Sequence, residues 1–277
     1  MAKKERIDVL LVEQGLFETR EKAKRAVMAG LVYVEEERVD KPGMKLDSDS
    51  ILTVKGKTLP YVSRGGLKLE KALNVFDMTV EDKIVIDIGA STGGFTDCSL
   101  QNGARHVYAL DVGYNQLAWK LRQDERVHVM ERTNFRYVKP EDLPFGMPQF
   151  ATIDVSFISL KLILPVLKTL LVSNSDVVAL VKPQFEAGRD DVGKKGIVRD
   201  KKVHERVLNE MVQFSLDTGY SVNGIDFSPI TGGEGNIEFL LHLHWNEQES
   251  PKVNVENATE EVVSMAHHHL KVNNNDS

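Results

Sequence analysis

Four charged residues stand at or near the ends of apolar segments, where side chains often do chemistry. Asp154 follows "ATI", Lys182 follows "VVALV", and Glu238 lies inside "NIEFLL". A fourth, Lys68, belongs to "SRGGLKLEKAL". Lysines and carboxylates can move protons or stabilise a developing oxyanion, provided that the fold gathers them. Each residue alone also has a structural interpretation, since Asp154 could cap the next helix and the lysines could be solvated.

The elements that would gather these residues alternate along the chain. A strand, a helix and another strand recur often enough to predict about seven strands in an α/β sheet. In such a sheet the carboxyl ends of parallel strands line the ligand crevice, so Asp154 and Lys182 should converge there. The last strand should be antiparallel, because a short glycine-rich connection joins it to the sixth. Periodicity does not place Glu238. The predicted strands are "KIVIDIGA", "HVYALDVG", 126–130, 150–157, 176–183, "YSVNGIDFS" and "NIEFLLHLHW".

The stretch "KIVIDIGASTGGFTD" predicts a nucleoside-binding turn. A buried parallel strand leads into three glycines and a helix, and Asp111 ends the next strand, placed for ribose hydroxyls. The spacing G-x-x-x-G-G lacks the dinucleotide-binding pattern and the lysine of a phosphate loop. A cofactor without a pyrophosphate, such as S-adenosylmethionine, fits better, with Gly89 close to its methionine part and Asp87 near its ammonium. A merely structural turn is the alternative. The other candidate cofactor residues here are Ala90, Ser91, Gly93, Gly94 and Phe95.

The bulk composition is that of a folded globular protein. Hydrophobic residues make up 42% of the 277 residues and charged residues 27%, which argues against general disorder. No apolar run reaches the roughly 18 residues of a membrane span, and no secretion signal is evident. The single cysteine, Cys98, cannot form an intramolecular disulfide or a thiolate metal site, and it is expected to be a small buried residue. We expect a cytoplasmic protein without a metal.

Positive charge is concentrated at the front of the chain, although the whole has a net charge of −6. Residues 1–71 hold 15 Lys and Arg against 12 Asp and Glu. Two short helices and small strands are expected there, and the second helix, "TREKAKRAVMAG", is crowded with cations. These cations could bind RNA phosphates or simply form a solvated face with partners one turn away. The candidate RNA-binding residues are Arg6, Arg20, Lys22, Lys24 and Arg25, with Arg64 in the linker.

Two resemblances sharpen these expectations. The order "RIDVLLVEQGLFETREKAKRAVMAGLVYV…DKPG" resembles the small RNA-binding domain named after ribosomal protein S four. Residues 60–245 resemble the FtsJ-like ribose methyltransferases, and the marks "SRGGLKL", "DIGASTGGFTD", "IDVSFISL" and "LVKPQFEAG" resemble the TlyA family. The resemblance implies a Rossmann-like class I methyltransferase fold, an α/β seven-stranded sheet, with a small amino-terminal α+β RNA-binding domain. The expected divisions are 1–59, 60–245 and a polar tail, 246–277.

The same resemblance implies a reaction: transfer of methyl from S-adenosylmethionine to a ribose 2′-hydroxyl of ribosomal RNA, usually of cytidine. The family's active site uses Lys, Asp, Lys and Glu in this order, which correspond to Lys68, Asp154, Lys182 and Glu238. Lys182 is the candidate base or oxyanion-stabilising cation. The family's adenine-contacting acid is not evident; Asn134 stands there instead.

Alternative functions remain open from the sequence. The TlyA family has carried a haemolysin label, so a membrane-active protein is one alternative, although the sequence offers no span and no convincing amphipathic surface helix. A ribosome-binding factor with a vestigial fold is another, and the intact glycine loop argues against it. Residues 186–200 could be a mobile lid, an RNA-contacting loop or a plain solvated loop. The tail is expected to be disordered or lightly helical. The oligomeric state, monomer or homodimer, is not decidable.

Overall fold

The computed structural model describes residues 4–28, 30–35, 37–55, 59–254 and 258–272. The chain divides into two compact units, residues 1–60 and 61–277. The predicted linker residues 56–58 and the tail residues 255–257 and 273–277 lie outside the described residues.

The first unit packs two helices against short strands. Buried Ile7, Leu11, Val27 and Val32 belong to its core. Strands β2, β3 and β5 form one antiparallel sheet, and β1 pairs with β4 in a second. The β1–β4 pair was not predicted, because strands of three residues leave almost no periodic signal. The elements are β1 Lys4–Arg6, α1 Ile7–Glu13, α2 Arg20–Met28, β2 Val32–Val34, β3 Glu37–Val39, β4 Lys45–Asp47 and β5 Leu52–Val54.

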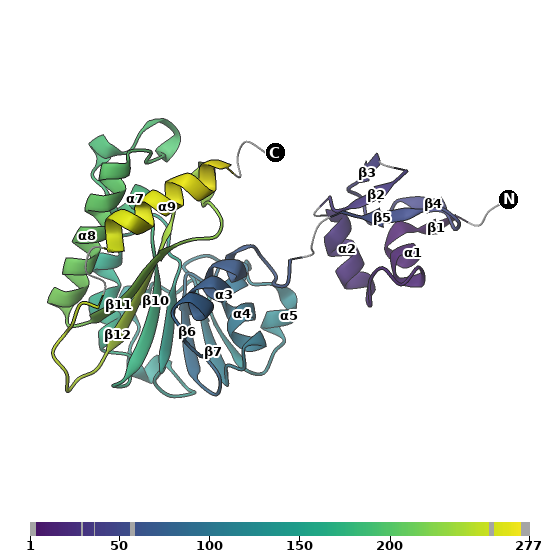
Figure 1. The fold of residues 1–277 in the computed structure, drawn as a ribbon. Helices are drawn as coiled ribbons and strands as arrows, with labels where there is room; N and C mark the ends of the chain where they lie inside the picture. The colour runs from purple at the N-terminus through teal and green to yellow at the C-terminus, as the bar shows by residue number, and fades with distance from the viewer. Residues whose placement is uncertain (1–3, 29, 36, 56–58, 255–257, 273–277) are drawn as a thin grey trace. The chain divides into compact units, whose positions relative to one another are not determined.

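The second unit is built on a seven-stranded sheet, as predicted (Figure 1). Its strand order is β11-β12-β10-β9-β6-β7-β8. The five strands from β10 to β8 are parallel, and β12 runs antiparallel to both β10 and β11, so the predicted antiparallel last strand is confirmed. The strands are β6 Ile84–Ile88, β7 His106–Leu110, β8 Val127–Met130, β9 Phe150–Ile153, β10 Ser175–Val181, β11 Ser221–Phe227 and β12 Phe239–Trp245.

Helices cover both faces of this sheet. Side chains alternate along each strand, so Ile84, Ile86 and Ile88 face one layer and Val85 the other. The first layer contains α6 and α8, and the second contains α3 and α4. The helices are α3 Gly65–Val75, α4 Gly94–Gln101, α5 Trp119–Arg122, α6 Leu164–Lys168, α7 Pro183–Glu186, α8 Lys201–Thr218 and α9 Ala258–Val272.

The carboxyl-terminal region differs from the expected polar tail. Residues 258–272 form the 15-residue helix α9, which packs on α8 and β11 (Figure 1). Its apolar side buries Val262, Val263 and Ala266 in the core of the second unit. The segment is polar in overall composition, and this conceals its apolar side, because only every third or fourth residue must be apolar for one side of a helix to be buried.

Candidate functional site

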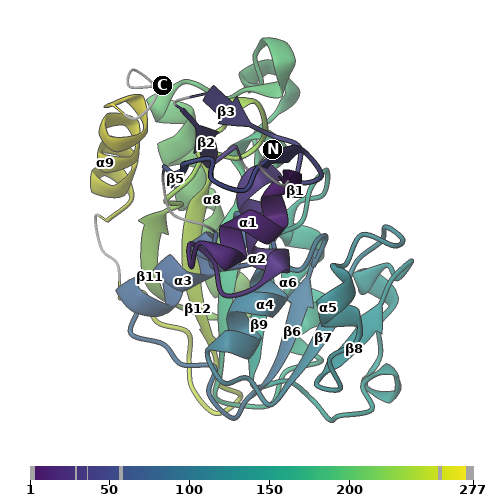
Figure 2. The same ribbon diagram turned by 90° about the vertical axis from the view of Figure 1, so that its right-hand side faces the viewer.

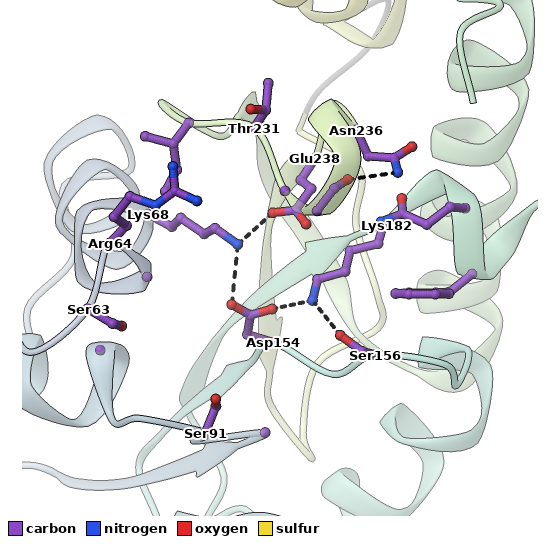
Figure 3. A pocket seen from close by; sticks show the side chains of 18 of the residues that line it. Ser63, Arg64, Lys68, Ser91, Asp154, Ser156, Lys182, Thr231, Asn236 and Glu238 are labelled. Atoms are coloured by element: carbon purple, nitrogen blue, oxygen red, sulfur yellow. Dashed lines mark hydrogen bonds and ion pairs between the residues drawn. The ribbon is translucent and has the colours of Figure 1, made fainter. Parts of the chain in front are cut away.

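A cavity of about 650 Å³ opens at the edge of the sheet where the parallel strands end. Lys68 from α3, Asp154 after β9, Lys182 after β10 and Glu238 before β12 all line it (Figure 3). Because β12 is antiparallel, its first residues lie at the same edge as the last residues of β10. This explains why Glu238, which precedes its strand, joins side chains that follow theirs.

The four side chains form one network of ion pairs. Lys68 Nζ lies 2.5 Å from Glu238 Oε2 and 3.3 Å from Asp154 Oδ2. Lys182 Nζ lies 2.5 Å from Asp154 Oδ1 and donates a hydrogen bond to Ser156 Oγ at 3.2 Å. Both lysines are 7% exposed and Glu238 is 2% exposed. Two lysines therefore face two carboxylates in a largely buried cluster, with Asp154 bridging the lysines.

The cluster holds Lys68 and Asp154 in their charged forms. Burial lowers the pKa of Lys68, but Asp154 and Glu238 outweigh burial and raise it above its ordinary value. Burial likewise raises the pKa of Asp154, but the two lysines outweigh it, and the net pKa is lowered. Lys68 is therefore a poor proton acceptor and Asp154 a poor proton donor near neutral pH.

A second cavity of about 470 Å³ adjoins the first and shares Gly89, Ser91 and Asp154 with it. Asp111 and Asn134 line this second cavity, as expected of residues that would contact a nucleoside. Asp111 accepts backbone hydrogen bonds from Ser91 at 2.8 Å and from Gly113 at 2.7 Å. The carboxylate thus fixes the glycine turn and the loop after β7 together. Asn134 caps the short turn 135–137 by accepting from the backbone of Arg136.

Different steric contacts leave no room for a side chain at the individual glycines of the turn. A Cβ on Gly89, where φ is +88°, would lie 2.5 Å from the carbonyl oxygen of Asp154, so the turn packs directly on the backbone after β9. A Cβ on Gly94 would lie 2.7 Å from the backbone nitrogen of Gly66. These contacts bring the turn, Asp154 and the start of α3 together around one cavity. Of the other predicted residues of the turn, Ala90, Ser91 and Phe95 line this cavity.

Two predicted cofactor residues do not line either cavity. Asp87 lies two residues after Val85 on β6, so its side chain points to the same face of the sheet, towards α4. There it is fully buried and accepts hydrogen bonds from Thr96 at 2.7 Å and Thr152 at 2.9 Å. Burial raises its pKa to about 7. Among the residues that line the two cavities Asp87 does not appear, so its contact with the cofactor's ammonium stays a prediction. Gly93 directly precedes α4, has φ at +97° and leaves no room for a Cβ beside Leu121.

The candidate RNA-binding cations have mixed surroundings. Arg6 and Arg20 both contact the buried carboxylate of Asp8, at 2.8 and 2.9 Å, which ties α1 to α2. In the same unit Lys22 pairs with Glu18 and Lys24 with Glu21, whereas Arg25 is exposed. All five lie in the first unit, so their cationic ends are partly committed to local partners. Arg64 lies in the second unit and lines the 650 Å³ cavity.

Several cavity residues escaped sequence reasoning. Ser156 holds Lys182, and Phe157, at φ +64° and 92% exposed, lies in both cavities beside Phe185 with ring centroids 5.0 Å apart. Asn236 lines the first cavity and is 3% exposed. The apolar letters of "FATIDVSF" suggested a strand over residues 150–157, but β9 ends at Ile153. An aromatic residue four positions beyond a strand end was the available signal.

Asn236 fastens the loop that was considered as a lid. Its side chain accepts from the backbone N–H of Val198 at 3.1 Å and donates to the carbonyl of Gly196 at 3.0 Å. Gly196 and Lys195 line the first cavity. The loop therefore forms one wall of the site and is tied to the segment that carries Glu238.

Two negative findings concern the described residues alone. No helix among them has the length and apolar character needed to cross a membrane. Within the same ranges, no group of three or more His, Cys, Asp or Glu side chains is arranged to hold a metal ion.

Comparisons with known proteins agree with this architecture. The family model for FtsJ-like methyltransferases matches residues 61–245, and the S4 domain model matches residues 5–52. The chain is 41% identical to the 16S/23S rRNA (cytidine-2′-O)-methyltransferase TlyA of Mycobacterium tuberculosis, over 88% of this chain and 91% of that one. It is 45% identical to Hemolysin A of Brachyspira hyodysenteriae, over 86% of this chain and 99% of that one.

A solved structure from Streptococcus thermophilus, which bears a provisional hemolysin assignment, has a TM-score of 0.79 and 61% identity, and the match covers 99% of this chain and 100% of that one. The matched length and the sequence identity of these relatives exceed what a shared fold alone would give. The chain belongs to the FtsJ-like methyltransferase family and has an S4 domain in its first unit.

Proposed function

We propose that this protein transfers a methyl group from S-adenosylmethionine to a ribose 2′-hydroxyl of ribosomal RNA. The observation that carries the proposal is the buried Lys68, Asp154, Lys182 and Glu238 cluster beside the glycine turn. A relative 41% identical is named for cytidine-2′-O methylation of 16S and 23S rRNA, and we propose the same substrate class here.

The glycine turn and the second cavity fit the cofactor. Gly89 keeps the turn free of a side chain where the two cavities meet, and Asp111 lies where ribose hydroxyls would be bound. Asn134 offers an amide to the adenine. S-adenosylmethionine supplies an electrophilic methyl group when bound. This arrangement would leave the 650 Å³ cavity, with its charged cluster, for the target nucleotide.

The cluster suits activation of a weak nucleophile. A ribose hydroxyl must lose its proton as its oxygen gains the methyl, and a nearby cation stabilises the negative charge that develops on that oxygen. Lys182 is our candidate for this role, either as the ammonium that stabilises the oxygen or, when neutral, as the base. Lys68 stays protonated because of its raised pKa. It holds Asp154 and Glu238, which orient Lys182 and the hydroxyl.

The entrance to the cavity suits an unstacked nucleotide. Phe157 is 92% exposed with a left-handed backbone, a conformation that costs energy unless the surroundings or a function compensates for it. An exposed ring at a cavity entrance can stack on a base that has left its helix. Arg64 lines the same cavity and can meet a phosphate. We therefore propose that the S4 domain grips structured RNA while the second unit receives one nucleotide, in the cytoplasm where ribosomes assemble.

The experiment is transfer of labelled methyl from S-adenosylmethionine to purified ribosomal subunits and to naked rRNA. Lys182→Ala should lower the rate by roughly 10²- to 10⁴-fold while cofactor binding persists. Lys182→Arg separates the two roles, because arginine keeps the charge but does not give up its proton. Substantial activity in Lys182→Arg would assign oxyanion stabilisation, and its loss would favour the base.

A matched control is Lys71→Ala, one turn beyond Lys68 on α3. Lys71 pairs with Asp226 outside the cavity, so this variant should retain methyl transfer. If wild-type protein binds subunits and rRNA but transfers no label to either, the enzyme proposal fails, and a ribosome-binding factor becomes the better account. Lysis of erythrocytes by the purified protein without cofactor would instead favour the activity for which the relative Hemolysin A is named.

A further inference from the structure

Three large aromatic side chains stand exposed in the segments that follow β7 and β8, with Trp119 as the first residue of α5. Tyr114 is 63% exposed, Trp119 72% and Tyr137 71%. Single exposed apolar residues are normal, but three exposed rings within the 24 residues 114–137 point to an interaction site. Together with Arg132 and Arg136, these residues form what we call the aromatic platform.

The two arginines of the platform lie against its rings. The guanidinium carbon of Arg132 lies 4.0 Å from the centroid of Tyr114, and that of Arg136 lies 5.6 Å from the centroid of Tyr137. Arg132 holds this position with φ at +52° and a backbone hydrogen bond to Gly113 at 2.9 Å. Within the described ranges, neither arginine forms an ion pair with a carboxylate. Their charges are therefore available to an anionic partner.

The platform borders the proposed active site. Strands β6, β7 and β8 lie side by side (Figure 2) and are parallel, so all three end at the same edge of the sheet. Val112, two residues before Tyr114, is 72% exposed and lines the second cavity, as does Asn134, between the two arginines. That cavity shares Ser91 and Asp154 with the cavity of the charged cluster. A polymer that reaches the cluster can thus extend over the platform.

We propose that the aromatic platform binds unpaired nucleotides of the RNA chain next to the one that is methylated. This inference rests on the proposed function, because it takes RNA as the substrate. Tyrosine, tryptophan and arginine planes are the surfaces on which unstacked bases lie, and arginine also meets phosphates. Charge favours a nucleic acid over a symmetric contact with a second copy of this chain: residues 112–139 hold six Arg and Lys against three Asp and Glu, and a symmetric contact would bring two such positive segments together.

Trp119 allows a direct test that does not depend on activity. The sequence has only two tryptophans, Trp119 and Trp245, and Trp245 ends β12 beside Tyr220 and Lys168. In the full-length Trp245→Phe variant, Trp119 is the only tryptophan reporter. Addition of an unstructured 12-nucleotide RNA should quench its emission with a saturable dependence on RNA, and a duplex RNA of equal length should not. RNA that binds, by anisotropy, without changing Trp119 emission would overturn the proposal.

A second test measures affinity in the Tyr114→Ala/Tyr137→Ala double variant. Loss of stacking should weaken binding of the single-stranded RNA by roughly tenfold or more, since one stacked base contributes about that much, while duplex binding changes little. The matched control is Arg105→Ala, an exposed cation at the opposite end of β7, which should leave single-stranded binding unchanged. Equal losses for both RNA forms, or for both variants, would contradict the platform.

The outcomes separate this inference from the proposed function. Quenching and selective loss of single-stranded binding without methyl transfer would support the platform and refute the enzyme. Methyl transfer to rRNA with an unchanged KM for RNA in the double variant would support the enzyme and refute the platform. A wild-type dimer in light scattering that the double variant converts to a monomer would show that the platform binds a second copy, and would overturn the RNA assignment. S-adenosylmethionine binding, measured by calorimetry, must be retained in the double variant.

Discussion

The buried carboxyl group of Asp87 offers a quantitative test of how this sheet is built. Burial raises its pKa to about 7, against an ordinary value of 3.8. Between these values the folded protein binds more protons at Asp87 than the unfolded chain does, so the stability contributed by this group falls as pH rises. The shift of about 3 pKa units corresponds to about 4 kcal/mol lost once pH exceeds 7. Asp87→Asn stays neutral at every pH and should escape this cost.

The expected gain can be calculated at two pH values. Relative to wild type, Asp87→Asn should gain about 2.5 kcal/mol more stability at pH 8 than at pH 5, because at pH 5 the folded wild type is still protonated. The amide can keep contacts with Thr96 and Thr152, since each hydroxyl can accept as well as donate. The assay is urea unfolding followed by tryptophan emission. Both tryptophans lie in the second unit, so the signal does not report the first unit.

Two results would refute this reasoning. An equal effect of Asp87→Asn at pH 5 and pH 8 would mean that Asp87 titrates near its ordinary value. A large loss of S-adenosylmethionine affinity, with stability unchanged, would mean that the carboxylate contacts the cofactor after all. Asp111→Asn is the control for cofactor binding, because Asp111 lines the second cavity and Asp87 does not.

Three further predictions follow from contacts. Gly89→Ala should abolish cofactor binding, because its Cβ would lie 2.5 Å from a backbone carbonyl, whereas Gly196→Ala, also at positive φ but in open space, should retain it by calorimetry. Asn236→Ala should release the Gly196 and Val198 backbone, speed tryptic cleavage of that loop and lower methyl transfer about tenfold; unchanged cleavage would refute this role. Burial and His267 lower the pKa of His204 to about 4, so between pH 4 and 6.5 the unfolded chain binds more protons than the folded protein. The free energy of unfolding should therefore fall by up to about 3 kcal/mol as pH drops through that range. In His204→Leu this pH dependence should be absent.

The sequence predicted the sheet well because its strands are long and buried on both sides. Near-continuous apolar runs, each followed by a helical pattern, leave few other arrangements. It predicted the cluster less directly. Asp154 and Lys182 follow parallel strands, whereas Glu238 joins them only because β12 is antiparallel. Without the family's pattern, nothing local in "NIEFLL" shows to which edge that carboxylate belongs.

Other features depended on information that spacing does not contain. The face of the sheet to which the Asp87 side chain points follows from the alternation of side chains along β6, and a shift of the strand by one residue would turn it to the other face. Helix α9 was hidden by the polar composition of its segment, although Val262, Ala266 and Leu270 recur at helical spacing and are buried. The exposed ring of Phe157 was mistaken for part of a strand because aromatic residues favour strands. In each case tertiary contacts, and not local propensity, decided the outcome.

The composition of the charged cluster follows from the charge balance of the proposed reaction. Transfer of methyl from a sulfonium cofactor removes one positive charge from the site, and the hydroxyl releases one proton. The total charge of the cavity is therefore conserved if the proton stays on a cluster residue. If Lys182 is the base, it starts as a neutral amine, and the four residues then carry a net charge of −1 that the +1 of the sulfonium balances. The proton that Lys182 accepts from the hydroxyl replaces the lost sulfonium charge beside Asp154. An unpaired charge in this buried site at either stage would carry a large desolvation cost, so we expect methyl transfer to need all four residues together.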